Sequence, residues 1–358
     1  MSRVGARLGP LGLAGVLSLI LLAGCGSAAS QPSRGVALVS IGAGLKGPTV
    51  LRAELYATGP ATTSAFAFDA RGRLWLTAAG LETHGQDGVY LVPRAGAHAV
   101  RVIHGLDDPL GMLWRGGTLY VASLGRVDAY AGFDGHRFAV HRRVLSGPVA
   151  GGENNLLALA PNGRLVMGVT ASCDHCTPSS RLSGAVVSFR PDGSDLRLYA
   201  SGIRAPVGLA FYPGTSDLFA SMNQRDDLGA ATPGDALALL REGENWRFPA
   251  CYGQGSSACV GVPKAIAVLD KHAAVGAVAI VTGQLGAGVG TAALVAEWST
   301  GLIKSVALVR TSSGYTGTAR TLLSGIANPL ALGLAPDGAL LLGAWSSGKI
   351  YRISARAS

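Results

Sequence analysis

Residues 206–222 read PVGLAFYPGTSDLFASM, and this stretch has the pattern of a β-hairpin. Two apolar runs of strand length flank a turn rich in Pro, Gly, Ser and Asp, which are the residues that commonly end strands. A polar loop follows at once and contains Asn223, Gln224, Arg225, Asp226 and Asp227. Because binding sites are often built on charged loops beside a rigid scaffold, this loop is the first candidate site.

The same hairpin pattern occurs five more times along the chain. Each copy has an apolar strand, a turn rich in Gly or Asp, and a second apolar strand, and the copies lie at 65–78, 109–123, 154–170, 275–298 and 329–345. Successive copies start roughly 40 to 70 residues apart, which fits four-stranded blades with loops of variable length. The pattern predicts an all-β fold, a six-bladed β-propeller. A β-sandwich is the competing architecture, and six copies of one hairpin favour the propeller.

The two ends of the repeat region predict how the ring closes. Only one strand-like segment, residues 348–354, follows the sixth hairpin, so the last blade lacks a partner strand. Near the N-terminus, residues 49–57 (TVLRAELYA) form a spare strand. We expect this strand to pair beside the C-terminal strand, because that pairing removes exposed sheet edges. Residues 45–358 are therefore predicted to form one propeller domain.

The composition supports this fold and excludes one class of partner. Of 358 residues 52 are Gly and only 14% are charged, which suits short strands joined by tight turns better than helices. The formal net charge is +9. The chain has no block of Lys and Arg with interleaved aromatic residues, so nucleic acid is not an expected partner.

The N-terminal residues have the layout of an export signal. Basic residues precede an apolar run at 11–22, and the sequence LAGC ends at Cys25. We predict a lipoprotein signal peptide at 1–24, lipidation of Cys25, and a flexible tether at 25–44. The protein is thus expected to be exported and held on the outer face of the cell membrane by its lipid. An uncleaved membrane helix is the alternative, but the apolar run is short for a span.

Export also decides how the other four cysteines are interpreted. Cys173 and Cys176 lie in CDHC, and Cys251 and Cys259 flank a short loop. An even number of cysteines outside the cytosol favours two structural disulfides. A zinc half-site or a redox pair at CDHC are the alternatives. Zinc needs further ligands, and a redox pair is expected in a βαβ setting that this sequence lacks.

Four short motifs make a specific resemblance. They are GIRAPVGLAF (202–211), NQRDDLG (223–229), PGD (233–235) and GENWRFPACYG (243–253). In this order they resemble the glucose/sorbosone dehydrogenase family, whose members are six-bladed propellers, several of them using pyrroloquinoline quinone (PQQ) with calcium. The resemblance implies PQQ-dependent oxidation of a sugar or an aldehyde at the cell envelope.

The resemblance also implies roles for individual residues. Arg204 matches an arginine that pairs with a carboxylate of the quinone, and its alternative role is to fix the turn before Pro206. The implied cofactor contacts are Asn223, Gln224 and Arg225. The implied calcium ligands are Asp226, Asp227 and Asp235, since calcium binds oxygen ligands. In the alternative interpretation the same loop residues only hydrogen-bond within the loop, because Gln224 and Ala236 replace two carboxylates that the family has.

Other family positions have changed, which bears on catalysis. The family's catalytic histidine would fall near Gly152, and no histidine is there. The family's cofactor lysine in the fifth repeat and its arginines before the sixth repeat are also missing. The remaining candidates for the base are Glu153, which alternatively caps its strand, and His272.

Three tryptophans follow inner hairpins, which supports a second hypothesis. Trp246, Trp298 and Trp345 would stack on sugar rings if they are exposed, or pack between blades if they are buried. The second hypothesis is a non-catalytic propeller that binds a glycan or a partner protein and has lost its redox site. The two hypotheses differ at the mouth of the channel, because only the enzyme needs charged groups that converge there.

Overall fold

The computed structural model describes residues 37–81, 83, 85–146, 152–253 and 256–356. The predicted signal peptide, Cys25 and the first part of the predicted tether lie outside these residues. Within the described residues the fold is almost entirely β, with two short 3-10 turns, η1 (Gly229–Ala231) and η2 (Ser257–Cys259). No helix in this part of the chain is long and apolar enough to span a membrane.

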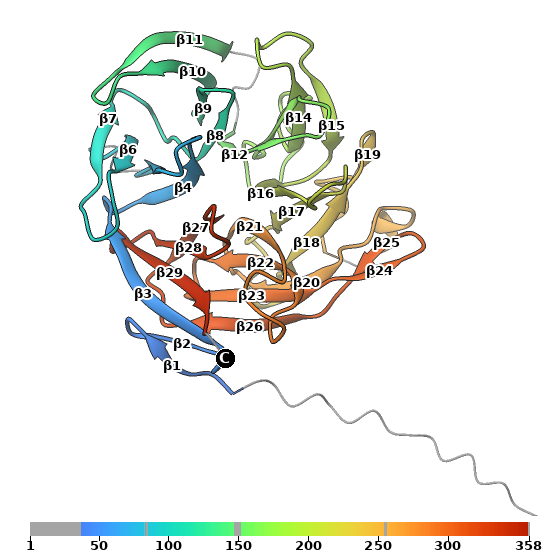
Figure 1. The fold of residues 1–358 in the computed structure, drawn as a ribbon. Helices are drawn as coiled ribbons and strands as arrows, with labels where there is room; N and C mark the ends of the chain where they lie inside the picture. The colour runs from blue at the N-terminus through green and yellow to red at the C-terminus, as the bar shows by residue number, and fades with distance from the viewer. Residues whose placement is uncertain (1–36, 82, 84, 147–151, 254–255, 357–358) are drawn as a thin grey trace, which may run out of the picture. The chain divides into compact units, whose positions relative to one another are not determined.

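The described strands form six blades arranged in a ring around a central axis (Figure 1), which confirms the predicted propeller. Each blade starts with one of the six hairpins found in the sequence. The first three blades contain β4 (Thr63–Phe68), β5 (Leu74–Ala78), β6 (Gly88–Val92) and β7 (Val100–Ile103); β8 (Gly111–Arg115), β9 (Thr118–Ser123), β10 (Arg126–Phe133) and β11 (Phe138–Ser146); and β12 (Asn154–Leu159), β13 (Leu165–Val169), β14 (Ala185–Phe189), β15 (Arg197–Ser201) and the parallel β19 (Glu244–Asn245).

The last three blades follow the same plan. They contain β16 (Ala205–Phe211), β17 (Leu218–Asn223), β18 (Gly234–Leu240) and β20 (Ala267–Lys271); β21 (Val275–Thr282), β22 (Thr291–Glu297), β23 (Leu302–Ala307) and β26 (Ala319–Ser324); and β27 (Pro329–Leu334), β28 (Leu340–Ala344), β29 (Lys349–Ala355) and β3 (Leu51–Thr58). A separate hairpin, β24 (Val309–Thr311) with β25 (Gly314–Thr316), extends from the fifth blade.

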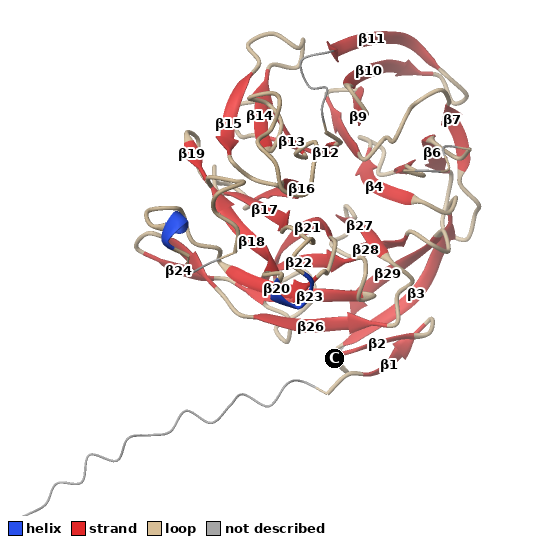
Figure 2. Ribbon diagram, turned by 180° about the vertical axis from the view of Figure 1, so that it is seen from behind, coloured by secondary structure: helices blue, strands red, loops and turns tan. Residues whose placement is uncertain are grey.

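Strand β3 closes the ring as the sequence predicts. It pairs antiparallel with β29 along its whole length, from Thr58 opposite Lys349 to Leu51 opposite Ala355. The two strands come from opposite ends of the chain, and they lie side by side as blue and red in Figure 1. The view from behind shows the same closed ring (Figure 2). This pairing gives the sixth blade its fourth, outermost strand, so β29 is not left as an unpaired edge.

The tether is shorter than predicted. Its expected end was residue 44, but β1 (Val39–Gly42) and β2 (Leu45–Gly47) form a hairpin that joins the outer edge of the fifth blade through Lys46 and Ser324. Ile41 and Leu45 are almost fully buried in the core there. Two buried apolar side chains therefore order a segment whose small residues alone suggested a flexible linker.

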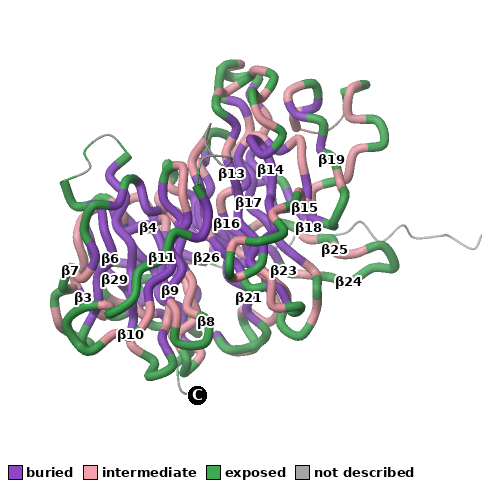
Figure 3. The backbone as a smooth tube through the Cα atoms, turned by 90° about the horizontal axis from the view of Figure 1, so that it is seen from above, coloured by how far each residue is buried: buried purple, intermediate pink, exposed green. Residues whose placement is uncertain are grey.

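The core lies between neighbouring blades rather than at the central axis. Six clusters of buried apolar residues each join two adjacent blades, so every blade buries both of its faces (Figure 3). The innermost strands can then approach closely. A Cβ placed on Gly208 of β16 would lie 2.4 Å from the carbonyl oxygen of Gly276 in β21. Only glycine fits at such a contact.

A buried serine connects the fourth and fifth blades at this contact. The Ser221 hydroxyl accepts a hydrogen bond from the Gly208 amide (2.8 Å) and donates one to the Gly276 carbonyl (2.6 Å). Ser221 is fully buried, so water cannot replace the hydroxyl if it is removed. The hydroxyl therefore satisfies one amide and one carbonyl that the close approach excludes from solvent.

We expect Ser221→Ala to lower the free energy of unfolding by about 2 kcal/mol, because it leaves two buried backbone groups unpaired. Urea denaturation followed by circular dichroism measures this change. Ser194→Ala is the matched control, since Ser194 is exposed and its hydroxyl bonds only to Asp192 in the same turn. The control should change stability by less than about 0.5 kcal/mol. Equal effects of the two substitutions would contradict the bridging role.

Candidate functional site

Loops at one end of the propeller bring charged side chains together. Four charged residues each lie just before the innermost strand of a blade: Asp108 before β8, Glu153 before β12, Arg204 before β16 and His272 before β21. The innermost strands of successive blades run in the same direction along the central axis, so the loops that enter these strands lie at the same end of the propeller. Charged groups from the second to the fifth blade thus converge there, as the enzyme hypothesis requires.

The loop after β17 is held in place by backbone contacts to three segments. Asn223 Oδ1 accepts a hydrogen bond from the Val275 amide (2.6 Å), and Gln224 Oε1 accepts one from the Gly253 amide (3.0 Å). The Gln224 amide donates to Asp235 Oδ1 (2.7 Å). The hydrogen-bonding role considered for these residues is therefore present. They also line a cavity of about 420 Å³, whose walls are Arg204, Asn223, Gln224, Asp226, Asp235, His272, Ala274 and Ser299.

Arg204 is not free in this cavity. Its Nη2 lies 2.6 Å from Asp174 Oδ1 and 3.5 Å from Asp226 Oδ2, and its Nε donates to the Asp174 carbonyl (3.3 Å). The guanidinium therefore bridges two carboxylates from different loops. Sequence reasoning missed Asp174, because only the cysteines and His175 of the CDHC segment suggested chemistry.

His272 has its two ring nitrogens at two oxygen atoms. Nδ1 lies 2.8 Å from Asp226 Oδ1, and Nε2 lies 3.2 Å from the Gly229 carbonyl oxygen. A carbonyl oxygen accepts only, so Nε2 carries a proton, and the carboxylate favours a second proton on Nδ1. These contacts, with the Asp226 carboxylate first, raise the pKa of His272. These contacts favour the protonated ring, which is unfavourable for the base predicted from the sequence.

Asp235 is the least solvated carboxyl of the cavity. Its residue is 3% exposed, and its Oδ2 has no hydrogen-bond partner among the described residues. Burial raises the pKa of Asp235 to about 7, and the negative charge of Asp226 acts in the same direction. An unpartnered buried carboxylate oxygen has two favourable states, one with a proton and one beside a cation. Asp235 is therefore the strongest candidate ligand for a metal ion here.

Glu153 lies at the entry to the third blade, close enough to Arg204 and Asp108 for their charges to act on it. Its Oε2 accepts a hydrogen bond from the Thr170 hydroxyl at 3.5 Å. Burial is the main cause that raises the pKa of Glu153, and Asp108 raises it further. A carboxylate with a raised pKa is a suitable general base near neutral pH, so Glu153 keeps its predicted role as a candidate.

Two residues that the sequence predicted as cofactor or calcium contacts, Arg225 and Asp227, do not line the cavity. Arg225 and Asp227 form a charged pair in which Arg225 Nε donates to Asp227 Oδ1 at 2.6 Å. The Arg225 guanidinium also lies over the ring of Tyr252, 4.4 Å from its centroid. Neither residue lines the cavity of about 420 Å³. The predictions of Arg225 as a cofactor contact and Asp227 as a calcium ligand are thus not supported, because each side chain satisfies the other.

The three tryptophans divide into two groups. Trp246 is 7% exposed and belongs to the core between the third and fourth blades, so it packs as its alternative role required. Trp298 and Trp345 are half-buried and form an edge-to-face pair with centroids 5.6 Å apart. Trp298 directly precedes Ser299 of the cavity wall. Neither ring is among the residues that line the cavity, so the pair lies next to its wall rather than in it.

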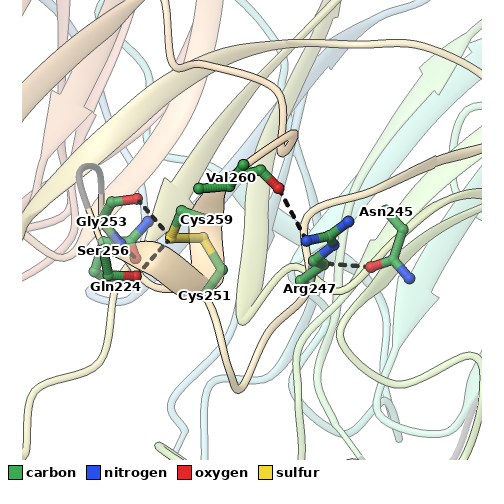
Figure 4. The surroundings of a disulfide bond; sticks show 8 residues. All are labelled: Gln224, Asn245, Arg247, Cys251, Gly253, Ser256, Cys259 and Val260. Carbon is green, nitrogen blue, oxygen red and sulfur yellow. Dashed lines mark hydrogen bonds between the residues drawn. A yellow bond between two sulfur atoms is a disulfide. The ribbon is translucent and has the colours of Figure 1, made fainter.

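Both predicted disulfides are present, Cys173–Cys176 and Cys251–Cys259. Figure 4 shows the second one beside Gln224 and Gly253, where it fixes the segment that supports the cavity loop. Disulfides are typical of proteins outside the cytosol, which fits an exported protein.

Lys304, the first lysine after the fifth hairpin, pairs with Asp270 (2.8 Å) and lies near the buried Glu297 (3.7 Å). It is not among the residues that line the cavity.

A further group of carboxylates lies beside the site, at Asp87, Asp107 and Asp108. Asp87 accepts hydrogen bonds from the amides of Gly80 (2.8 Å) and Asp108 (2.9 Å), and Asp108 accepts one from the Leu81 amide (2.7 Å). These contacts brace the loops between the first and second blades. The group therefore has a structural explanation.

The described residues form a six-bladed propeller with a charged cavity at one end, a fold that solved structures of sugar dehydrogenases share. Solved structures with this fold include a putative glucose dehydrogenase from Thermus thermophilus (20% identity, TM-score 0.69, 85% of this chain and 99% of that one). Others are a PQQ-bound aldose sugar dehydrogenase from Streptomyces coelicolor (17%, 0.69, 87% and 100%) and a calcium-containing carbohydrate-active enzyme of family AA12 from Trichoderma reesei (17%, 0.71, 91% and 99%).

These likenesses confirm the predicted resemblance at the level of the fold. No family model matches the sequence. No curated protein matches it either. The chemistry of this chain must therefore be argued from its own residues.

The raised pKa of Asp235 predicts a pH dependence of stability. The carboxyl keeps its proton up to about pH 7 in the folded protein but only to 3.8 when unfolded. The folded state therefore binds more protons between these values, and stability should fall as the pH rises from about 4 to about 7. At about 1.4 kcal/mol per pKa unit, the loss amounts to a few kcal/mol.

Asp235→Asn should remove this part of the pH dependence and raise stability at pH 8, because an uncharged amide replaces the buried carboxylate while its oxygen can still accept from the Gln224 amide. Urea denaturation of the wild type and the variant, without divalent cations, measures the free energy of unfolding at pH 5 and at pH 8. A variant that loses stability equally at both pH values would contradict the assigned pKa.

Proposed function

We propose that this protein is a glucose/sorbosone dehydrogenase-like enzyme that oxidises a sugar or an aldehyde with PQQ at the cell envelope. The observation that carries the proposal is the convergence of Glu153, Arg204, Asp226, Asp235 and His272 at one end of the propeller. Among these residues Asp235 is buried, and a buried carboxyl is costly to fold, which a ring without a ligand at this end would have no need to keep. Solved sugar dehydrogenases with the same fold include PQQ-bound and calcium-containing structures, which supports the choice of cofactors.

The residues present fit a cation and an anionic quinone on one side of the cavity. Asp235, with its unpartnered Oδ2, would hold calcium together with oxygen atoms of the loop after β17. Asp226 contributes less, because Arg204 and His272 already share its carboxylate. Arg204 would pair with a carboxylate of the quinone. Bound there, the quinone would supply the oxidant for the hydride that leaves the substrate carbon.

The protein's own part in the reaction is to orient the substrate and to move its proton. Glu153, as the carboxylate, would take the proton of the substrate hydroxyl while the C–H bond breaks, leaving a carbonyl product. Its raised pKa makes it a stronger base than an ordinary carboxylate. His272, whose pKa the Asp226 carboxylate raises, would orient the substrate or, when protonated, stabilise negative charge on oxygen. The half-buried pair Trp298 and Trp345 would contact the apolar face of a sugar ring.

A lipid at Cys25 would hold the enzyme on the outer face of the membrane, where extracellular sugars are available. We keep this anchor as a proposal from the sequence. Its test is metabolic labelling with a fatty acid that carries a clickable group, compared between the wild-type chain and Cys25→Ala.

The central test is titration of PQQ into the purified protein with calcium present, followed by calorimetry. We expect binding that depends on calcium and that weakens about tenfold or more in Arg204→Ala, because a charge-assisted pair is lost. Arg137→Ala is the matched control, since Arg137 is exposed on a turn. Glu153→Gln should retain the quinone but reduce dye reduction with aldoses or aldehydes about 100-fold or more. The absence of PQQ binding would reject the proposed function.

A second candidate function is favoured by the Trp298–Trp345 pair and by the prior occupation of Arg204 by Asp174. It is a non-catalytic propeller that binds a glycan or a partner protein at the cell envelope. In that case glycans should bind without PQQ or calcium, and binding should be lost in Trp298→Ala. A glycan array with the wild type and this variant distinguishes the two functions.

A further inference from the structure

Three donors converge on a single carboxylate beside the cavity. Asp174 Oδ1 lies 2.6 Å from Arg204 Nη2. The Asp226 amide donates to the same carboxylate at 3.0 and 3.1 Å, and the Asp227 amide donates to Oδ2 at 3.0 Å. A guanidinium and two successive backbone amides form a preorganised receptor for a carboxylate. The chain fills this receptor with its own side chain.

The carboxylate comes from a loop that a disulfide closes. Asp174 lies between Cys173 and Cys176, in the connection from β13 to β14. The side chains of Asp174 and Arg204 are 32% and 19% exposed, so solvent reaches the pair from one side. An ion pair that solvent can reach is open to exchange with another anion, unlike one that is sealed in a core. Asp174 is thus placed as a competitor for whatever Arg204 binds.

The next residue of the loop contacts a second cavity. The ring of His175 lies edge-on to Tyr252 with centroids 6.0 Å apart. Tyr252, Trp246 and Phe248 line an apolar cavity of about 240 Å³, and Arg204 lies in the wall of both cavities. The CDHC loop therefore contacts the walls of both cavities, through Asp174 on Arg204 and His175 on Tyr252. A ligand with a carboxylate and a flat apolar body would match both sides of this boundary.

We propose that Asp174 is an internal ligand that occupies the carboxylate receptor formed by Arg204 and the amides of Asp226 and Asp227, and that a carboxylate-bearing small molecule enters only by displacing it. The inference rests on the proposed function in that the quinone, which bears carboxylates, is one such molecule. The CDHC loop acts as a built-in plug, and the Cys173–Cys176 disulfide limits how far Asp174 can move away. Ligand affinity is then the affinity of the open receptor, reduced by competition from Asp174.

The first experiment measures access to Arg204 without any ligand. Phenylglyoxal modifies accessible guanidinium groups, and peptide mass spectrometry gives the rate at Arg204, with the exposed Arg137 in the same sample as reference. We expect slow modification in the wild type and about tenfold faster modification in Asp174→Asn, which removes the charge of the internal ligand. Asp192→Asn is the matched control, because Asp192 lies on an exposed turn and accepts hydrogen bonds from Ser194. Equal rates at Arg204 in all three proteins would overturn the proposal.

The second experiment measures the competition itself. PQQ is titrated with calcium into the wild type, Asp174→Asn and the double variant Cys173→Ser with Cys176→Ser. We expect binding about tenfold tighter in Asp174→Asn and an intermediate gain in the double variant, in which the loop is free but Asp174 remains. Tighter binding to the wild type than to Asp174→Asn would show that Asp174 assists the ligand, which overturns the proposal.

The two experiments separate this proposal from the proposed function. Faster phenylglyoxal modification in Asp174→Asn, with no PQQ binding in any variant, would support the plug and reject the quinone. Thermal shifts with benzoate and citrate would then identify the carboxylate class. PQQ binding that is equal in all variants, with Arg204 equally accessible, would reject the plug and keep the enzyme. Near-ultraviolet circular dichroism confirms that each variant is folded, and the double variant tests the plug if Asp174→Asn fails to fold.

Discussion

The close packing of neighbouring blades is the constraint on which the other features of this protein depend. Each blade buries both faces against its neighbours, and the six clusters of apolar residues lie at the six junctions. Near the axis the approach is so close that no Cβ fits at Gly208, and Ser221 must satisfy the backbone groups that lose access to water. This packing holds the entry loops of successive blades at fixed positions. Rigid loops at one end can then bring together charged side chains that, in a flexible chain, would repel one another or be separately hydrated by water.

The charges at that end are balanced by pairs that run between loops. Arg204 lies between Asp174 and Asp226, and His272 shares Asp226 with it. Asp235 has no such partner for its Oδ2 within the described part of the chain, and burial raises its pKa. The site thus combines satisfied pairs, which fix its shape, with one carboxyl that gains from a proton or a cation. A carboxyl with a raised pKa among paired charged groups is typical of functional cavities, whereas purely structural networks pair all of their charges.

The two disulfides fix two neighbouring segments of this arrangement, which contact each other through His175 and Tyr252. Cys251–Cys259 fixes the segment whose Gly253 amide donates a hydrogen bond to Gln224, so this disulfide helps to hold the loop after β17 in place (Figure 4). Cys173–Cys176 closes the loop that places Asp174 against Arg204. Outside the cytosol, covalent links of this kind keep short polar loops in place where little apolar surface is available to bury.

The sequence by itself determined the architecture. Hairpins that alternate with period two and end at Gly, Pro and Asp report local backbone preferences, and six copies of one pattern leave few ways to bury their faces. The spare strand at 49–57 and the unpaired strand at 348–354 even predicted the closure of the ring. Only the tertiary structure decided which charged residues meet. Arg225 pairs with Asp227 in its own loop, whereas Arg204 binds Asp174, which lies 30 residues away in sequence. The Arg204–Asp174 pair depends on a distance of a few ångströms between loops of different blades, and no periodic pattern along the chain encodes it.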